Sequence, residues 1–292
     1  MNSKVSTKKS LSEQVAEVRE SMMSKDAKCK ALIKLGFTPY EVEFVLRENQ
    51  SKTGFTFGVE IECLMMRSRF IERARDNRML YEYQGYNHTD NRSYYKFVTD
   101  SSIHGDNPIE CVSPILEGND KGFESLKNCC KTLNEADAKV NRSTGLHVHI
   151  GASGMTDKWF LNVFRNYQRL ESIIDTFMAP SRRRDNNTFC KSLQGYNFDY
   201  ACNTIADVQR KLSSRYYKVN PMSINRHGTI EFRQHQGTTD FEKISNWVRF
   251  CAKLVQWSKE NVLCTDALNI DNIPFITESE KAFFKSRANA LR

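Results

Sequence analysis

A change of hydrophobic period at Gly54 constrains the fold of this chain more than any other feature of its sequence. From Phe55 to Cys63 every second residue is apolar, and the positions between them are mostly polar or charged. A period of two is typical of a strand that buries one face and leaves the other free. The sequence therefore predicts a sheet with one apolar face that begins near residue 54.

Further strands and helices follow in irregular order. Helices are predicted at residues 156–178, from an apolar stripe, and after the capping pairs Thr239 with Glu242 and Thr277 with Glu280. Because strands and helices show no regular strand–helix–strand repeat, the chain is predicted to be α+β, with a largely antiparallel sheet and flanking helices. The further strands are predicted at residues 95–100, 109–113, 146–150, 216–223 and 229–234.

The first fifty residues are predicted to be almost entirely helical. Thr38, Pro39 and Glu41 supply an N-cap, a proline in the first turn and a capping-box glutamate for a helix over residues 39–49. With a second helix at residues 29–35, they predict a helical N-terminal extension over 1–50, ahead of a catalytic domain over 54–292. The extension is either a small interaction unit or a helical collar packed on the main domain.

Composition narrows the class of protein. The 292 residues include 43 Lys and Arg against 35 Asp and Glu, a net charge of +8 that favours polyanions such as nucleotides or nucleic acid. Hydrophobic residues make up 39%, which excludes a disordered chain. Nine cysteines without metal-finger spacing and no leader segment predict reduced thiols in a cytoplasmic protein. No apolar run reaches about 18 residues, so no membrane span is expected.

Three predicted strands carry acids, imidazoles or a guanidinium at alternate positions. Each set would project from one face of its strand, and like charges so placed repel unless a cation lies between them. Carboxylates with an occasional imidazole suit Mg²⁺ or Mn²⁺, and Mg²⁺ often bridges carboxylates to phosphates. The sequence lacks a P-loop and a Rossmann glycine motif, which favours metal-bridged nucleotide binding. The sets are Glu60 with Glu62, His147 with His149, and Glu231 with Arg233 and His235.

Four short motifs in order resemble the amidoligase family, relatives of glutamine synthetase and glutamate–cysteine ligase. They are FGVEIE at 57–62, ECVSP at 110–114, STGLHVH at 143–149, and TIEFR at 229–233 with Gly237 and Thr238. The resemblance covers about residues 54–257. It implies an ATP-dependent carboxylate–amine ligase that forms an amide, peptide or isopeptide-like, through an acyl phosphate. It also implies a glutamine synthetase-like curved antiparallel sheet that binds divalent ions on its concave face.

The resemblance also implies roles for individual residues. One Mg²⁺ or Mn²⁺ site matches Glu60, His147 and Glu231, and a second matches Glu62 and Glu110. His149 and Arg233 match positions that contact phosphate or the substrate carboxylate, and Arg182, Arg183 and Arg215 resemble phosphate-binding arginines that would hold ATP. From its place after a strand, Asp100 is a candidate base for the amine, with turn formation as its alternative role.

Two other functions stay open at this point. A zinc hydrolase would use His147, His149 and a glutamate to activate water, but it leaves most of the strand carboxylates without a role. A nucleic-acid-binding protein would use Lys8, Lys9 and the arginines at 182–184, but the strand acids would repel phosphate. The expected partners are a carboxylate and an amine, with a peptide or protein as one candidate acceptor. The pattern does not identify either substrate.

Overall fold

The computed structural model describes residues 14, 17–18, 25–36, 54–85, 94–264 and 268–292. The chain divides into two compact units, residues 1–53 and residues 54–292. In the first unit, helix α2 spans Lys25–Lys34 and covers most of the helix predicted at 29–35. The helix predicted over 39–49, with its capping residues, lies outside the described residues.

The second unit is built on one sheet of eight strands within the described residues, in the order β2-β3-β4-β1-β6-β8-β7, with β5 beside β1. Only β2 and β3 pair in parallel; every other pairing in the described sheet is antiparallel. The prediction of a largely antiparallel α+β domain is therefore confirmed. The strands are β1 Thr56–Leu64, β2 Tyr81–Gly85, β3 Tyr95–Val98, β4 Pro108–Val112, β5 Leu116–Glu117, β6 Gly145–Gly151, β7 Val219–Asn220 and β8 Thr229–Gln236.

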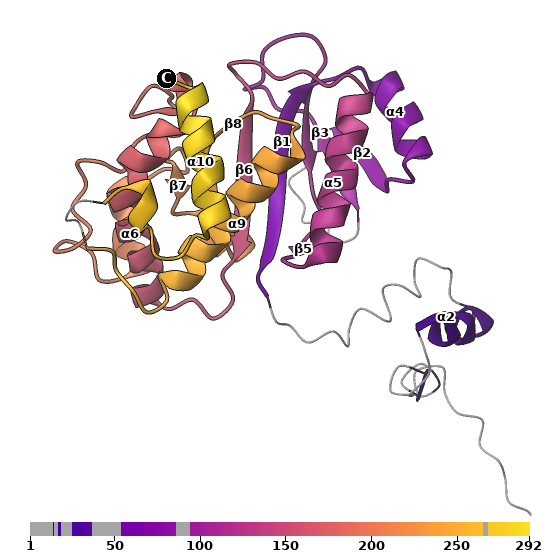
Figure 1. Ribbon diagram of the computed structural model, residues 1–292, viewed down its shortest axis with the longest axis horizontal. Helices are drawn as coiled ribbons and strands as arrows, with labels where there is room; N and C mark the ends of the chain where they lie inside the picture. The colour runs from indigo at the N-terminus through magenta and orange to yellow at the C-terminus, as the bar shows by residue number, and fades with distance from the viewer. Residues whose placement is uncertain (1–13, 15–16, 19–24, 37–53, 86–93, 265–267) are drawn as a thin grey trace, which may run out of the picture. The chain divides into compact units, whose positions relative to one another are not determined.

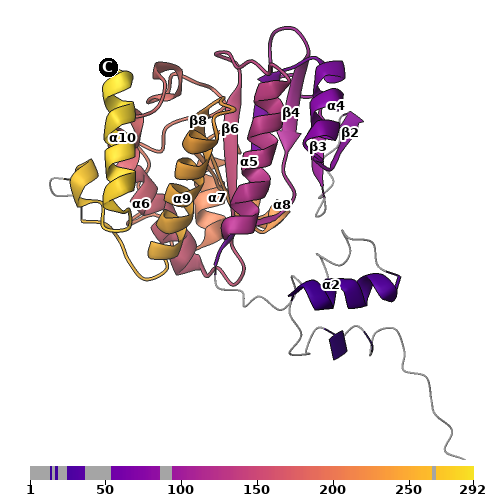
Figure 2. The same ribbon diagram turned by 45° about the vertical axis from the view of Figure 1, so that its right-hand side comes forward.

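Helices cover one face of this sheet. Helices α5 and α9 cross in front of the strands in both views (Figures 1 and 2). Two short 3-10 turns, Pro180–Arg182 and Ile270–Asn272, join the longer elements. The helices are α4 Arg67–Asp76, α5 Asp120–Glu135, α6 Asp157–Thr176, α7 Ile205–Leu212, α8 Ser223–His227, α9 Phe241–Trp257 and α10 Glu278–Ala290.

The core lies between the apolar face of the sheet and these helices. On β1, Phe57, Val59 and Ile61 are at most 2% exposed, as the alternating pattern predicts. The stripe predicted on α6 is also buried, with its members at most 1% exposed: Phe160, Val163, Phe164, Tyr167, Leu170, Ile174 and Phe177. The opposite face of the sheet, which carries the charged residues of β1, β6 and β8, is thereby left for the site.

Two sequence predictions need correction at element ends. Helix α9 is capped by Asp240, whose carboxylate accepts the Lys243 N–H, and not by Thr239 as predicted. The strand predicted over 216–223 shrinks to Val219–Asn220, because Pro221 has no N–H to donate to a ladder. The capping box of α10, by contrast, is present as predicted.

The prediction that His235 shares a face with Glu231 and Arg233 is wrong. In the β6–β8 register Phe232 pairs with Val148 and His235 pairs with Leu146, so β8 contains one extra residue at a bulge. A bulge breaks the strict alternation of side chains. His235 therefore enters the core, where its ring lies 5.9 Å from that of Trp247 and burial lowers its pKa to about 3.

Cysteine state and helix length agree with two further expectations. All nine cysteines lie in the described ranges, and none forms a disulfide. No described helix combines the length and the apolar character that a bilayer crossing requires.

Candidate active site

Strand register brings the charged residues of four strands together on the free face of the sheet. Glu60 lies opposite His147, and Glu62 lies opposite Glu110. On the other side of β6, His149 lies opposite Glu231. Because directly opposed residues share a face with their Cβ atoms about 5 Å apart, these pairs form one continuous patch.

The first group of possible metal ligands consists of Glu60, His147 and Glu231, with one donor atom of each within 4.8 Å of the others. His147 Nδ1 lies 2.8 Å from Glu60 Oε2 and 3.9 Å from Glu231 Oε1. Burial by itself raises the pKa of Glu60, but its contacts with His147 and His149 outweigh burial and hold that pKa well below its usual value. The carboxylate form of Glu60 is therefore favoured.

The second group consists of Glu62, Glu110 and His147, within the same 4.8 Å limit. His147 Nε2 lies 3.6 Å from Glu62 Oε1, and the Gly145 N–H donates to Glu62 Oε2 at 2.6 Å. All three side chains are buried. Since His147 belongs to both groups, its two ring nitrogens connect them.

Glu110 lies where the patch gathers negative charge. Its pKa is raised well above the usual value, first by burial and then by the negative charges of Glu60, Glu62 and Asp100. A divalent cation would supply the missing counter-charge. Carboxylate oxygens with one imidazole are ligands that Mg²⁺ and Mn²⁺ accept.

Arg233 and Asn220 hold the carboxylate of Glu231 from two sides. Arg233 Nη1 donates to Glu231 Oε1, and the Asn220 amide donates to Oε2 at 2.5 Å. Burial raises the pKa of Glu231, but the positive charges of Arg233 and His149 outweigh it and leave the pKa lowered. Arg233 Nε donates in turn to the carbonyl of Phe189 at 3.2 Å.

His149 is held by hydroxyl groups at one ring nitrogen. Its Nδ1 lies 2.9 Å from the Thr229 hydroxyl, which also lies 2.8 Å from that of Ser223. Its Nε2 lies 3.3 Å from Glu60 Oε1. Burial lowers the pKa of His149, yet the charge of Glu231 and the contact with Glu60 leave it raised overall. The imidazole is thus fixed in orientation and favoured as a cation.

A cavity of about 570 Å³ opens over this patch. Glu62 is the one member of the two groups that does not line it. Asp100 lies at the cavity wall, where its Oδ1 also accepts the Ser102 N–H at 2.7 Å, the turn geometry considered as its alternative role. Arg215 is exposed at the cavity, with its guanidinium 5.1 Å above the Tyr216 ring.

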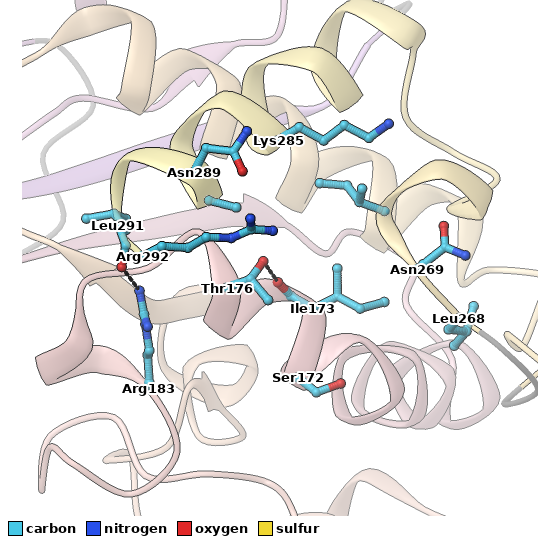
Figure 3. A pocket seen from close by; sticks show the side chains of 12 residues that line it. Ser172, Ile173, Thr176, Arg183, Leu268, Asn269, Lys285, Asn289, Leu291 and Arg292 are labelled. Atoms are coloured by element: carbon cyan, nitrogen blue, oxygen red, sulfur yellow. Dashed lines mark hydrogen bonds between the residues drawn. The ribbon is translucent and has the colours of Figure 1, made fainter.

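The structure does not bring Arg182 and Arg183 to this cavity. Arg182 is 3% exposed and donates to the Thr144 carbonyl at 2.6 Å. Arg183 donates to the carbonyls of Met178 and Leu291, both at 2.9 Å, and lines a second cavity beside α10 (Figure 3). Both arginines hold backbone in place, so the phosphate-binding role expected of them has no geometric support.

Sequence reasoning missed several residues of the cavity. Lys96 lines it and is only 7% exposed. Alternation along the strand predicted at 95–100 places Lys96 on the same face as Asp100, so the sequence could have predicted Lys96 as a residue of the site. Asn220, opposite Glu231 on β7, could not be found this way, because its strand is two residues long and only the register reveals the contact.

Three comparisons relate the chain to known proteins. The family model described as "Putative amidoligase enzyme" matches residues 53–255. The crystal structure of a bifunctional glutathione synthetase from Pasteurella multocida is similar with a TM-score of 0.41 and 11% identity. That alignment covers 85% of this chain and 42% of the other, so this chain spans less than half of that protein. A search of curated proteins found no match.

Proposed function

The chain belongs to the amidoligase family, and on this premise we propose that it is an ATP-dependent carboxylate–amine ligase. It would form an amide bond, peptide or isopeptide-like, through an acyl-phosphate intermediate, with residues 54–292 as a catalytic domain of glutamine synthetase-like type. One observation carries the proposal: two groups of side chains that could each hold a metal ion share His147 beneath one cavity.

The donor set fits two divalent ions. Glu60, His147 and Glu231 would hold one, and Glu62 and Glu110, with His147, would hold the other. Buried carboxylates this close need a cation, and an oxygen-rich set favours Mg²⁺ or Mn²⁺. When bound, these ions would neutralise the phosphate oxygens of ATP.

Each remaining residue has a role in the two chemical steps. A substrate carboxylate oxygen attacks the γ-phosphorus of ATP and ADP leaves; the amine nitrogen then attacks the acyl carbon and phosphate leaves. Arg233 and Arg215 bind phosphate oxygens, and His149 contacts the phosphoryl group or the substrate carboxylate. Asp100 accepts the proton that the amine loses.

The two rival functions receive less support. A zinc hydrolase uses three protein ligands and an open position, whereas this patch gathers four glutamates around its histidines. For nucleic-acid binding, Arg182 is buried and Arg183 is engaged with backbone carbonyls, while Lys8 and Lys9 lie outside the described residues.

The partners follow from the reaction. We propose a carboxylic acid and an amine as substrates, with a peptide or protein as a candidate acceptor. Cysteines that form no disulfide in the described residues fit a cytoplasmic setting for the activity.

The test measures ADP formation with Mg²⁺ or Mn²⁺ and mixtures of candidate acids and amines, followed by mass spectrometry of the products. We expect Glu60→Ala and Glu231→Ala to abolish metal-dependent turnover. Glu124→Ala is the matched control, because this glutamate is 71% exposed and pairs with Lys127 at the surface. Stoichiometric zinc without nucleotide binding would overturn the proposal in favour of a hydrolase.

A further inference from the structure

The loop of residues 183–193, here called the carbonyl loop, supplies one of the contacts that orient Arg233. Arg233 Nη1 donates to Glu231, and Nε donates to the Phe189 carbonyl in the middle of this loop. A guanidinium is planar, so fixing Nε and one terminal nitrogen fixes the direction of the remaining donors. The direction in which Arg233 faces the cavity therefore depends on where the carbonyl loop lies.

A buried charge cluster lies beneath both ends of the carbonyl loop. Lys218 Nζ contacts Glu171 Oε1 at 2.8 Å and Asp175 Oδ1 at 2.7 Å. The side chains of Lys218 and Glu171 are 0% and 1% exposed, and that of Asp175 is 15% exposed. None of the three belongs to the metal groups or lines the cavity over the site.

The two carboxylates of the cluster hold the loop at its ends. Asp175 Oδ2 accepts the Arg184 N–H at 2.8 Å, and Glu171 Oε2 accepts the Leu193 N–H at 2.8 Å. The Ser192 hydroxyl also donates to Glu171. Lys218 holds both carboxylates in place, and charge-assisted bonds of this kind are stronger than neutral ones.

The backbone of Lys218 joins the same loop to the strand that carries Arg233. Its N–H donates to the Lys191 carbonyl, and its carbonyl accepts the Arg233 N–H, both at 2.9 Å. One residue thus contacts the loop, the two carboxylates and β8.

We propose that Lys218 and Asp175 are positioning residues for Arg233, acting through the carbonyl loop and its Phe189 carbonyl. The orientation of Arg233 by the carbonyl loop does not depend on which reaction the protein catalyses. The kinetic consequence, weaker binding of ATP phosphates, rests on the proposed function.

The first test is the Asp175→Ala variant, which removes the contact with the Arg184 N–H at one end of the loop, and the contact with the Gln234 amide, but leaves Lys218 paired with Glu171. The readout is the Arg233 Nε–H resonance in ¹H–¹⁵N NMR spectra, assigned by its loss in Arg233→Met. We expect its hydrogen exchange to be roughly tenfold faster than in the wild type, because the loop that carries its acceptor is then held at one end only. In Glu280→Ala, which breaks a different partly buried ion pair with Lys253, exchange should be unchanged.

The second readout is kinetic. We expect Asp175→Ala to raise the KM for ATP roughly tenfold and to change kcat little, since the phosphate contact of Arg233 is weakened. In an Arg233→Met background the same substitution should add no further effect. A purely structural role predicts additive losses and an unchanged Arg233 resonance, and that result would overturn the proposal.

Two features keep the test decisive. If Asp175→Ala does not fold, Ser192→Ala removes one loop contact without unbalancing the buried charges, and we expect the same changes in smaller measure. An unaltered resonance in Ser192→Ala would count against the proposal. If the wild type binds no nucleotide in calorimetry with Mn²⁺, the proposed function fails, whereas the NMR result still decides the role of the cluster.

Discussion

Glu62 of β1 and Glu110 of β4 lie directly opposite each other, and both side chains are buried. Two carboxylates so placed repel each other and lack the water that would screen them. The pKa of Glu110 is raised accordingly, by burial first and by its neighbouring negative charges second. A divalent cation bound by both carboxylates would relieve this repulsion.

Glu110→Gln should stabilise the metal-free protein at neutral pH. The folded protein keeps a proton on Glu110 at pH values where the unfolded chain has lost it. The stability from Glu110 is therefore complete below its unfolded pKa of about 4.3 and is lost as pH rises through the raised folded value. Urea midpoints in chelator between pH 4.5 and 8 should favour the variant increasingly as pH rises. Parallel curves for Glu110→Gln and the surface control Glu124→Gln would contradict this.

Mn²⁺ binding should reveal two sites that depend on one histidine. We expect the wild type to bind two ions, measured by electron paramagnetic resonance titration, and to gain thermal stability. Glu62→Gln should weaken one site and leave the other. His147→Ala should weaken both by roughly tenfold or more, because its ring nitrogens face both groups. A single site that survives His147→Ala would rule out the shared ligand.

The arginines at 183 and 215 should respond in opposite ways to substitution. Arg183→Gln removes two hydrogen bonds to carbonyls and should lower the free energy of unfolding by about 1–3 kcal/mol, with the KM for ATP unchanged. Arg215 is exposed at the cavity, so Arg215→Gln should raise that KM several-fold without a change in Tm. Denaturant titration and steady-state kinetics of the same preparations separate the two outcomes.

Cysteine reactivity should follow burial. Burial raises the pKa of Cys63 to about 12 and the pKa of Cys129 well above its usual value. Seven cysteines are buried, Cys29 is partly exposed and Cys264 is exposed. Mass spectrometry after brief alkylation of the native protein should therefore find label at Cys264 first and Cys29 second. Rapid labelling of Cys129 without denaturant would show that its region opens locally.

Much of the sheet could be predicted because strand periodicity is a local property. The alternation of Phe57, Val59 and Ile61 with Glu60 identifies the two faces of β1 whatever strand lies beside it. The stripe on α6 and the capping box of α10 are local in the same sense. Helix α4 and strand β2 were not predicted, because both are short. Their aromatic residues Phe70 and Tyr83 pack against Phe97 of β3, and this contact is seen only in the folded structure.

For the candidate site, the sequence predicted which side chains share a face of their own strand, but not which strands lie side by side. Sequence alone determined that Glu60 with Glu62, and His147 with His149, project in pairs from their strands. Only the tertiary structure decided that β6 lies between β1 and β8, which brings His147 against Glu60 and His149 against Glu231.

The same distinction accounts for the failures at His235 and Arg183. Sequence determined which residues alternate along a strand, because the pleat repeats every two residues in any strand. The bulge that turns His235 into the core depends on β6 pairing with β8, and the engagement of Arg183 depends on a carbonyl 108 residues away. Such contacts form only when segments distant in the sequence pack together, so they cannot be predicted from the local sequence pattern.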